Sequence, residues 1–189
     1  GMGFARSICN TNAKLAIKRR NNNSMKTLST ERLILRDWCE DDIGCSVHNE
    51  DTIRYLINAK NNYAVVLKEN NEIIGTIGLN EDADGKEYVR NVGVRIVPQY
   101  QNRGYITEAL KAVLDHTTNT LSWFCKAEDS RSQHIAEKLG FAYVKTFAKA
   151  QYNLPSDFII HVVVPDGSDD LTDELWIELK MCYSYFFIC

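Results

Sequence analysis

The residues whose types and spacing most clearly suggest chemistry are Gln101-Asn102-Arg103-Gly104, between a Val-rich segment that ends at Pro98 and a segment with apolar residues at helical spacing. A polar, glycine-containing loop between a strand and a helix is suited to bind an anion, because the free N–H groups of the first helical turn point at the loop. Gly104 allows the backbone to approach a phosphate closely, and Arg103 adds a positive charge. The alternative interpretation is a tight turn followed by an ordinary helix cap.

The segments that must position this loop predict a mixed α+β (α/β) domain. Residue periodicity and turn signals predict strands at 33–35, 63–67, 73–79, 88–97, 121–125, from 143 onward, 159–164 and 175–179. A brief helix is expected from Glu40, and longer helices at 106–116 and 130–139, the last closed by Gly140. Three antiparallel strands followed by strand–helix–strand–helix–strand predict a mostly antiparallel mixed sheet flanked by helices.

Composition narrows the class of protein. The 189 residues are 44% hydrophobic and 25% charged, which is typical of a single globular domain. No apolar run reaches the roughly 20 residues that cross a bilayer, so no membrane association is expected. The first 30 residues carry six basic and no acidic side chains, which leaves 16 basic against 25 acidic residues, a balance of −9, in the rest. An acidic body argues against a nucleic-acid partner.

The six cysteines are scattered, without a CxxC pair or a histidine at metal-ligand spacing. We therefore expect no metal site and no disulfide framework, and a reducing, cytoplasmic compartment. Composition leaves the oligomeric state open between a monomer and a homodimer.

The two ends of the chain differ from its body. Gly1 before Met2 is typical of a cleaved expression tag, so residues 1–24 are interpreted as a tag scar and a basic extension that is non-native or flexible. A basic organellar targeting segment is a weaker alternative, and Met25 is the favoured true start. Residues 25–189 are then a single domain with an atypical tail, whose aromatic run at 183–189 is expected to pack on the sheet or in an interface.

An ordered set of motifs between about residues 27 and 147 resembles the GCN5-related N-acetyltransferase superfamily, in particular its branch of ribosomal-protein N-terminal acetyltransferase (RimJ/RimL)-like proteins. The motifs are Thr30-Glu31-Arg32-Leu33-Ile34-Leu35-Arg36, Glu40-Asp41-Asp42, Ile53-Arg54-Tyr55-Leu56, Ile73-Ile74-Gly75-Thr76-Ile77-Gly78-Leu79, Gln101-Asn102-Arg103-Gly104-Tyr105-Ile106-Thr107-Glu108-Ala109 and Glu137-Lys138-Leu139-Gly140-Phe141. The resemblance implies a sheet with a splayed central strand pair, acetyl-CoA as cofactor and an amine as acceptor.

The resemblance also implies a cofactor site. The family's pyrophosphate loop, Arg/Gln-x-x-Gly-x-Gly/Ala, falls on Gln101, Asn102, Arg103, Gly104, Tyr105 and Ile106. The amides from Arg103 to Thr107 would be the phosphate donors. Ile106 departs from the small residue of the family, and its branched side chain is expected to crowd the phosphate.

Further cofactor contacts implied by the resemblance lie on either side of this loop. The backbone of Val94 and Ile96 would pair with the pantetheine arm as an added strand does. Ser132 keeps the family's serine, with a role near the cofactor thiol or only in its own helix. Asp129 replaces the family's asparagine three residues earlier.

The chemistry requires a route for the amine's proton and a donor for the oxyanion. Relatives often place Glu where this chain has Asn91, and many place a tyrosine acid where it has Ala136. Glu87 is the nearest carboxylate on the same strand parity, with a solvated surface role as the alternative. The oxyanion would rest on a backbone N–H near Val94, and a positioned water with catalysis by proximity is sufficient. The candidate catalytic residues are thus Glu87, Asn91 and Ser132.

The predicted function is transfer of an acetyl group from acetyl-CoA to a primary amine, either a protein N-terminus or a small amine such as a polyamine, by direct attack in a ternary complex. The alternative is a non-catalytic acyl-CoA-binding or regulatory module of the same fold. Only six residues, 57–62, separate Leu56 from Tyr63, where relatives usually insert a helix and a loop. An acceptor groove lacking one wall is therefore expected.

Overall fold

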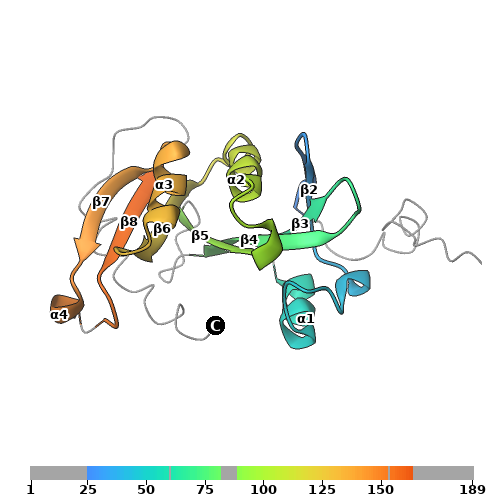
Figure 1. Cartoon of the computed structure of the whole chain (residues 1–189), viewed down its shortest axis with the longest axis horizontal. Helices are drawn as coiled ribbons and strands as arrows, with labels where there is room; N and C mark the ends of the chain where they lie inside the picture. The colour runs from blue at the N-terminus through green and yellow to red at the C-terminus, as the bar shows by residue number, and fades with distance from the viewer. Residues whose placement is uncertain (1–24, 60, 82–88, 153, 164–189) are drawn as a thin grey trace, which may run out of the picture.

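The structure is a computed structural model that describes residues 25–59, 61–81, 89–152 and 154–163. Its elements in chain order are β1 (Leu28–Ser29), β2 (Leu33–Arg36), η2 (Glu40–Asp42), α1 (Glu50–Asn58), β3 (Asn62–Leu67), β4 (Ile73–Glu81), β5 (Val89–Ile96), η3 (Pro98–Tyr100), α2 (Tyr105–Leu114), β6 (Thr120–Lys126), α3 (Ser130–Lys138), β7 (Ala142–Phe147), α4 (Lys149–Tyr152) and β8 (Phe158–Val163) (Figure 1). The predicted strand at 175–179 and the aromatic run at 183–189 lie outside the described residues.

The described strands form one eight-stranded sheet in the order β1-β2-β3-β4-β5-β6-β8-β7. Every neighbouring pair is antiparallel except β5 and β6, which run parallel. The predicted mixed, mostly antiparallel sheet is confirmed. The predicted strands from 33 to 164 correspond to β2 to β8, and the two predicted longer helices are α2 and α3.

Two elements differ from the sequence prediction. The brief helix expected at Glu40 is a single 3-10 turn, η2. The longer helix α1 follows it and was not predicted, although Ile53, Leu56 and Ile57 recur at helical spacing. Its start is fixed by a side-chain cap, in which Asn49 Oδ1 accepts a hydrogen bond from the Thr52 N–H at 2.8 Å. The connection from α1 to β3 is short, as the sequence predicted.

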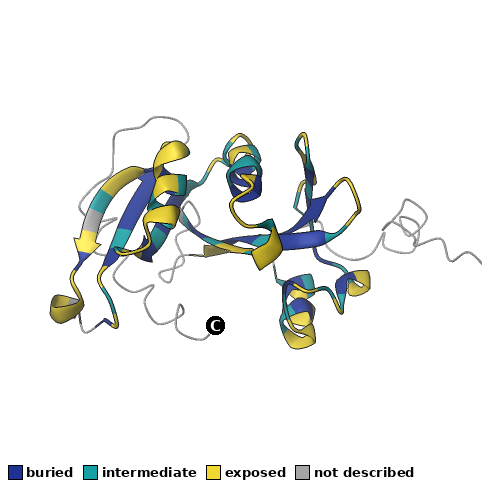
Figure 2. Ribbon diagram, in the orientation of Figure 1, coloured by how far each residue is buried: buried dark blue, intermediate teal, exposed yellow. Residues whose placement is uncertain are grey.

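Helices cover the two faces of the sheet. In Figure 1, α2 lies on one side of β4 and β5 and α1 lies on the other. Figure 2 shows the buried residues concentrated in the strands and on the inward sides of these helices. No helix within the described ranges is long and apolar enough to span a membrane.

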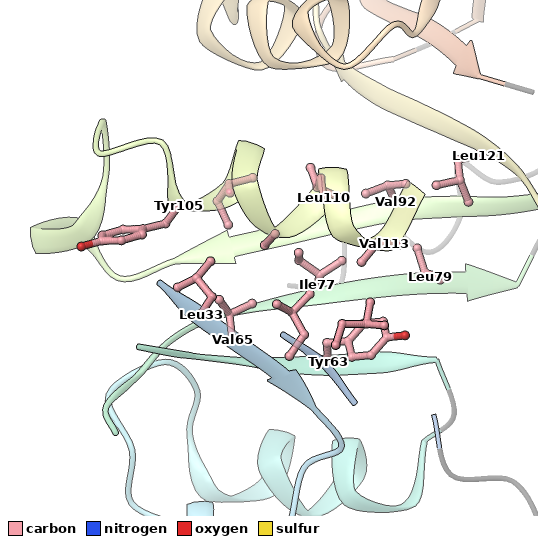
Figure 3. Close-up of a cluster of buried hydrophobic side chains, with 14 of the residues drawn as sticks. Leu33, Tyr63, Val65, Ile77, Leu79, Val92, Tyr105, Leu110, Val113 and Leu121 are labelled. Carbon is pink, nitrogen blue, oxygen red and sulfur yellow. The ribbon is translucent and has the colours of Figure 1, made fainter. Parts of the chain in front are cut away.

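The larger core cluster lies between α2, α3 and the sheet. Figure 3 shows Leu110 and Val113 of α2 directed at Ile77, Leu79 and the neighbouring strands. A smaller cluster lies on the opposite face, where the α1 residues Ile53 and Leu56 pack against β3.

Candidate active site

Strands β5 and β6 part after a short parallel pairing. Their register is Val89 with Thr120, Arg90 with Leu121 and Asn91 with Ser122, and β5 then continues to Ile96 while the other edge of β6 pairs with β8. Beyond Asn91, no strand among the described residues pairs with the β6-facing edge of β5. The splayed central pair implied by the resemblance is therefore present, and its open edge can pair with an extended ligand.

The N-terminus of α2 faces the loop that the sequence singled out. Gly104 is the N-cap and adopts a left-handed conformation with φ of 78°, which disfavours any other residue type. The first intrahelical hydrogen bond runs from the Glu108 N–H to the Gly104 carbonyl at 3.0 Å. The N–H groups of residues 105–107 consequently have no intrahelical acceptor, and they can bind an anion.

The loop is held close to the end of the open strand. Gln101 Nε2 donates to the Ile96 carbonyl at 3.5 Å, so the loop and the open edge of β5 meet at this point. Residues 101–104 are exposed, and the Arg103 guanidinium lies 5.6 Å from the ring centroid of Tyr100. A positive charge and free amides thus stand beside the end of a free strand edge.

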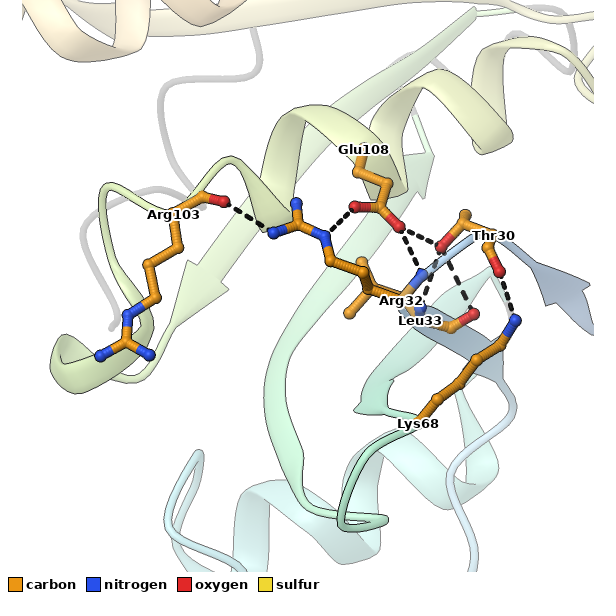
Figure 4. Close-up of polar contacts among 6 residues, drawn as sticks. All are labelled: Thr30, Arg32, Leu33, Lys68, Arg103 and Glu108. Atoms are coloured by element: carbon orange, nitrogen blue, oxygen red, sulfur yellow. Dashed lines mark hydrogen bonds and ion pairs between the residues drawn. The ribbon is translucent and has the colours of Figure 1, made fainter.

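An ion-pair network that the sequence reasoning missed anchors this loop to the N-terminal hairpin (Figure 4). Glu108 of α2 accepts hydrogen bonds from Thr30 Oγ1 at 2.5 Å, from the Arg32 backbone N–H at 2.9 Å and from Arg32 Nε at 2.6 Å. Arg32 Nη1 also donates to the Arg103 carbonyl at 3.1 Å, and its guanidinium lies 4.3 Å from the Tyr105 ring centroid. Thr30 and Arg32 were visible in the sequence as a motif, but nothing there paired them with a residue about 76 positions away.

The ionisation of Glu108 reflects this network. Partial burial raises the pKa of the carboxyl group, but the hydrogen bonds from Thr30 and Arg32 and the charge of Arg32 outweigh burial, so the net pKa lies below its ordinary value. Glu108 is therefore negatively charged at neutral pH and ties α2 to the hairpin.

The expected crowding of the loop by Ile106 is wrong. Ile106 is 7% exposed and belongs to the core cluster between α2 and the sheet, as does Tyr105. The first helical turn thus directs these two side chains inward and leaves its backbone amides for the loop. The departure from a small residue at position 106 alters the core and not the loop surface.

Two predicted site residues, Asp129 and Ser132, lie at the N-terminus of α3. Asp129 is the N-cap of α3, and its Oδ1 accepts a hydrogen bond from the Ser132 N–H at 3.1 Å. Ser132 Oγ accepts a hydrogen bond from Trp123 Nε1 of β6 at 3.1 Å. Both residues thus make structural contacts. The predicted cofactor contacts of Asp129 and Ser132 stay predictions.

A buried thiol lies beside them. Cys125 is 6% exposed, and its pKa is raised to about 11. Burial is the largest cause and the charge of Asp129 adds to it, while hydrogen bonds from Ser132 and Trp123 lower the pKa. This cysteine is protonated at neutral pH. Among the described residues, no group of three or more His, Cys, Asp or Glu side chains is arranged to hold a metal ion.

The site residues divide between the two faces of the sheet. Val94 and Ile96 share the face of Val92, whose side chain packs in the core cluster with α2 and α3. Asn91 lies on the opposite face, which it shares with Arg95. Arg95 is in register with Thr76 of β4, and Thr76 is in register with Ala64 of β3, which packs in the cluster under α1. The loop and the implied cofactor residues therefore lie on the α2 and α3 side, and Asn91 lies on the α1 side of the fork.

Asn91 lies where β5 and β6 separate. It is 6% exposed, and its Nδ2 donates to Ser122 Oγ at 3.1 Å. Ala136, at the position of the family's tyrosine, is fully buried in the core. Glu87, the candidate carboxylate, lies outside the described residues.

Comparison with known proteins gives one family. The model of the acetyltransferase (GNAT) domain matches residues 47–142, half of the chain. No curated protein matches the sequence.

Solved structures share the fold. An acetyltransferase of the GNAT family from Bacillus anthracis has a TM-score of 0.63 at 22% identity, over 75% of this chain and 99% of its own. The ribosomal-protein-S5-alanine acetyltransferase from Vibrio fischeri has a TM-score of 0.62 at 16% identity, over 76% and 98%. A ribosomal-protein alpha-N acetyltransferase, RimL, in complex with coenzyme A has a TM-score of 0.59 at 14% identity, over 74% and 98%. With the family match and this shared fold, the chain belongs to the GNAT acetyltransferase family.

Proposed function

We propose that this acetyltransferase transfers the acetyl group of acetyl-CoA to a primary amine, a protein N-terminus or a small amine, by direct attack in a ternary complex. The observation that carries the proposal is the open edge of β5, which ends beside the free amides at the start of α2. One ligand with an extended arm and a phosphate end fits both features at once.

The chain's own residues have separate tasks in this proposal. The backbone of Val94 and Ile96 offers hydrogen bonds to the extended arm, and the amides of residues 105–107 with Arg103 neutralise the phosphates. When bound, acetyl-CoA would supply the thioester: the neutral amine would form the C–N bond as the C–S bond breaks. Water would take the amine's proton and return a proton to the sulfur, so that CoA leaves as the thiol. A backbone N–H near Val94 stabilises the carbonyl oxygen.

The neighbours support a protein N-terminus as the acceptor. Two of the solved structures are named for acetylation of ribosomal proteins, one of them at an alanine. The acidic body of this chain favours a basic acceptor such as a ribosomal protein terminus, and polyamines remain the small-molecule alternative. The short connection between α1 and β3 leaves room for a peptide on that face.

We also propose a cytoplasmic location. Cys45 and Cys125 are free thiols, as expected in a reducing compartment. Nucleic acid and membrane partners are not proposed, and a monomer or a homodimer is equally compatible with the chain.

A non-catalytic acyl-CoA-binding module is the second candidate. It is favoured by Asn91, a group that cannot act as a base, and by the buried Ala136, which leaves no phenol at that position. Such a module would bind acetyl-CoA in the same way but would release no thiol.

Titration calorimetry followed by turnover tests both candidates. We expect wild-type protein to bind acetyl-CoA and to release CoA thiol, read with a thiol reagent, when given peptides with a free N-terminal Ala or Ser, or spermidine. Arg103→Ala should weaken acetyl-CoA binding by about threefold to tenfold through the loss of one charge-assisted contact. Arg54→Ala, an exposed arginine on α1 at the other face, is the matched control with unchanged binding.

Lack of binding at millimolar acetyl-CoA would rule out both candidates. Binding without thiol release across the whole amine panel would favour the module over the enzyme.

A further inference from the structure

Outside the proposed cofactor site, a pair of polar side chains lies where β5 and β6 separate. Asn91 and Ser122 form the last register pair of the two strands before the open edge begins. Both side chains are almost fully buried, at 6% and 1% exposure, and they lie on the face opposite to α2. Two neutral polar side chains thus sit at the base of the open edge, on the side of the sheet from which an acceptor can approach.

The hydrogen bonds of this pair fix which way the Asn91 carboxamide points. Ser122 Oγ lies 3.5 Å from the Arg90 carbonyl, which can only accept, so the serine proton is directed there. Ser122 Oγ must then act as the acceptor toward Asn91, and it receives Nδ2 at 3.1 Å. The amide nitrogen is committed, and Oδ1 faces the other way.

Oδ1 of Asn91 has no hydrogen-bond partner within the described part of the chain, although it is buried. A buried acceptor left without a donor destabilises a protein by about 1–3 kcal/mol, and such groups in native proteins call for an explanation. The missing partner must be a donor, because a carboxamide oxygen can only accept.

Two glycines lie next to Asn91 on the same face of the sheet. The next residue of β5 on the same face is Gly93, which is in register with Gly78 of β4, so two positions in a row carry no side chain. A Cβ built on Gly93 would meet, within 4 Å, only the Asn80 carboxamide nitrogen, at 3.1 Å. The approach to Asn91 is therefore bordered by backbone and by a second carboxamide.

We propose that Asn91 Oδ1 binds the N–H of the acceptor amine, and that Ser122 is the positioning residue that holds the carboxamide in this orientation. The inference rests on the proposed acetyl transfer. It assigns Asn91 a binding role and no proton transfer: Oδ1 aims the nitrogen at the fork, and the amine's proton leaves to water.

Steady-state kinetics with the best peptide of the Ala and Ser panel tests this assignment. Asn91→Leu keeps the size of the side chain and removes the acceptor, so kcat/KM for the peptide should fall about 10- to 100-fold while the Kd of acetyl-CoA stays within twofold. Asn91→Asp keeps an acceptor oxygen and should retain kcat/KM within about tenfold of wild type. Ser122→Ala frees the carboxamide to turn and should cost about threefold to tenfold, again without a change in acetyl-CoA affinity.

Gln151→Leu, which removes an exposed carboxamide from α4, is the matched control and should leave all constants unchanged. Thermal melting of each variant reports folding. If Asn91→Leu does not fold, the other two variants test the proposal. A threefold to tenfold loss of kcat/KM in Ser122→Ala, with Asn91→Asp within tenfold of wild type, would support it.

The possible failures are distinguishable. A wild-type protein that releases no CoA with any amine would overturn the proposed function and this inference with it. An active wild-type protein whose folded Asn91 and Ser122 variants keep kcat/KM within twofold would overturn the inference alone. A parallel loss of acetyl-CoA affinity would also overturn it, since Asn91 would then serve the cofactor side.

Discussion

Single residues decide whether the start of α2 can receive a phosphate. Gly104 has φ of 78°, in the region where an L side chain clashes with its own backbone. Ile106, by contrast, departs from the family loop without consequence for the loop, because the helix turns its side chain into the core. The backbone conformation at position 104 therefore matters more for the site than the side-chain type at position 106.

Replacing this glycine should separate strain from function. Gly104→Ala should lower the free energy of unfolding by about 1–2 kcal/mol and weaken acetyl-CoA binding by about fivefold or more, because relief of the strain shifts the first-turn amides. Calorimetry and urea denaturation measure the two effects.

Gly140→Ala is the matched control for this change. Gly140 has φ of 82° with open space around it, at the end of α3. It should lose similar stability with unchanged acetyl-CoA affinity. Equal loss of affinity in both variants would mean that global destabilisation, and not the loop, explains the effect.

The buried thiol at position 125 makes a second residue-scale prediction. With a pKa of about 11, only about one Cys125 in a thousand is a thiolate at pH 8. Iodoacetamide should therefore modify Cys125 more slowly than the half-exposed Cys39 and Cys45, as followed by mass spectrometry, with urea-unfolded protein as the control. Faster labelling of Cys125 in the folded protein would contradict its burial.

At the scale of elements, the position of α2 depends on a contact far away in the chain. Glu108 links the helix to the turn between β1 and β2 through three hydrogen bonds, and Arg32 extends the link to the loop carbonyl of Arg103 (Figure 4). The cofactor loop is thus held from both sides, by this network and by Gln101 on β5.

Removing the charge of Glu108 should destabilise the fold in a pH-dependent way. Because the folded pKa lies below the ordinary value of 4.5, the carboxylate stabilises the protein above about pH 4.5, and this stabilisation is lost as the pH falls through the folded pKa. Glu108→Gln should lower the free energy of unfolding by about 1–3 kcal/mol at pH 7, and the gap to wild type should narrow at pH 3.

Urea denaturation at both pH values measures this gap. Glu128→Gln is the control, since Glu128 is 76% exposed and makes only a 3.8 Å ion pair with Lys126, so its change should stay within about 0.5 kcal/mol. A gap for Glu108→Gln that widens toward acid would reverse the sign expected from the network.

At the scale of the whole molecule, the proposed cofactor site and the proposed acceptor site lie on opposite faces of the sheet. The face under α2 and α3 carries the open edge, the loop and Ser132, while the face under α1 carries Asn91 and the paired glycines. A ligand bound along the open edge and an acceptor bound at Asn91 would meet at the fork, which neither face forms alone.

The sequence interpretation of residues 1–24 as a non-native or flexible basic extension gives a prediction for the whole chain. Protein that starts at Met25 should fold with a thermal midpoint close to that of the full chain and bind acetyl-CoA with a Kd within twofold. Thermal melting and calorimetry of both forms measure this. A large loss of either property would assign residues 1–24 to the native domain.

The sequence by itself determined the local elements and the position of the loop for which anion binding is predicted. Periodicity in Ile106, Ala109 and Leu110, the stop at Pro98 and the glycine before the helix are local signals, so strand, loop and helix were predictable where they occur. Helix α1 was missed because its nine residues hold only three aliphatic side chains, Ile53, Leu56 and Ile57, although these recur at helical spacing.

Only the tertiary structure decided how these parts meet. The parting of β5 and β6 after Asn91, the anchoring of Glu108 by Arg32 and the pairing of Asn91 with Ser122 join residues 31 to 76 positions apart. Register between distant strands and the direction of a buried carboxamide depend on the packing of the entire sheet, because local spacing constrains neither. For this reason the sequence pointed to the cofactor loop, and the structure pointed to the acceptor side.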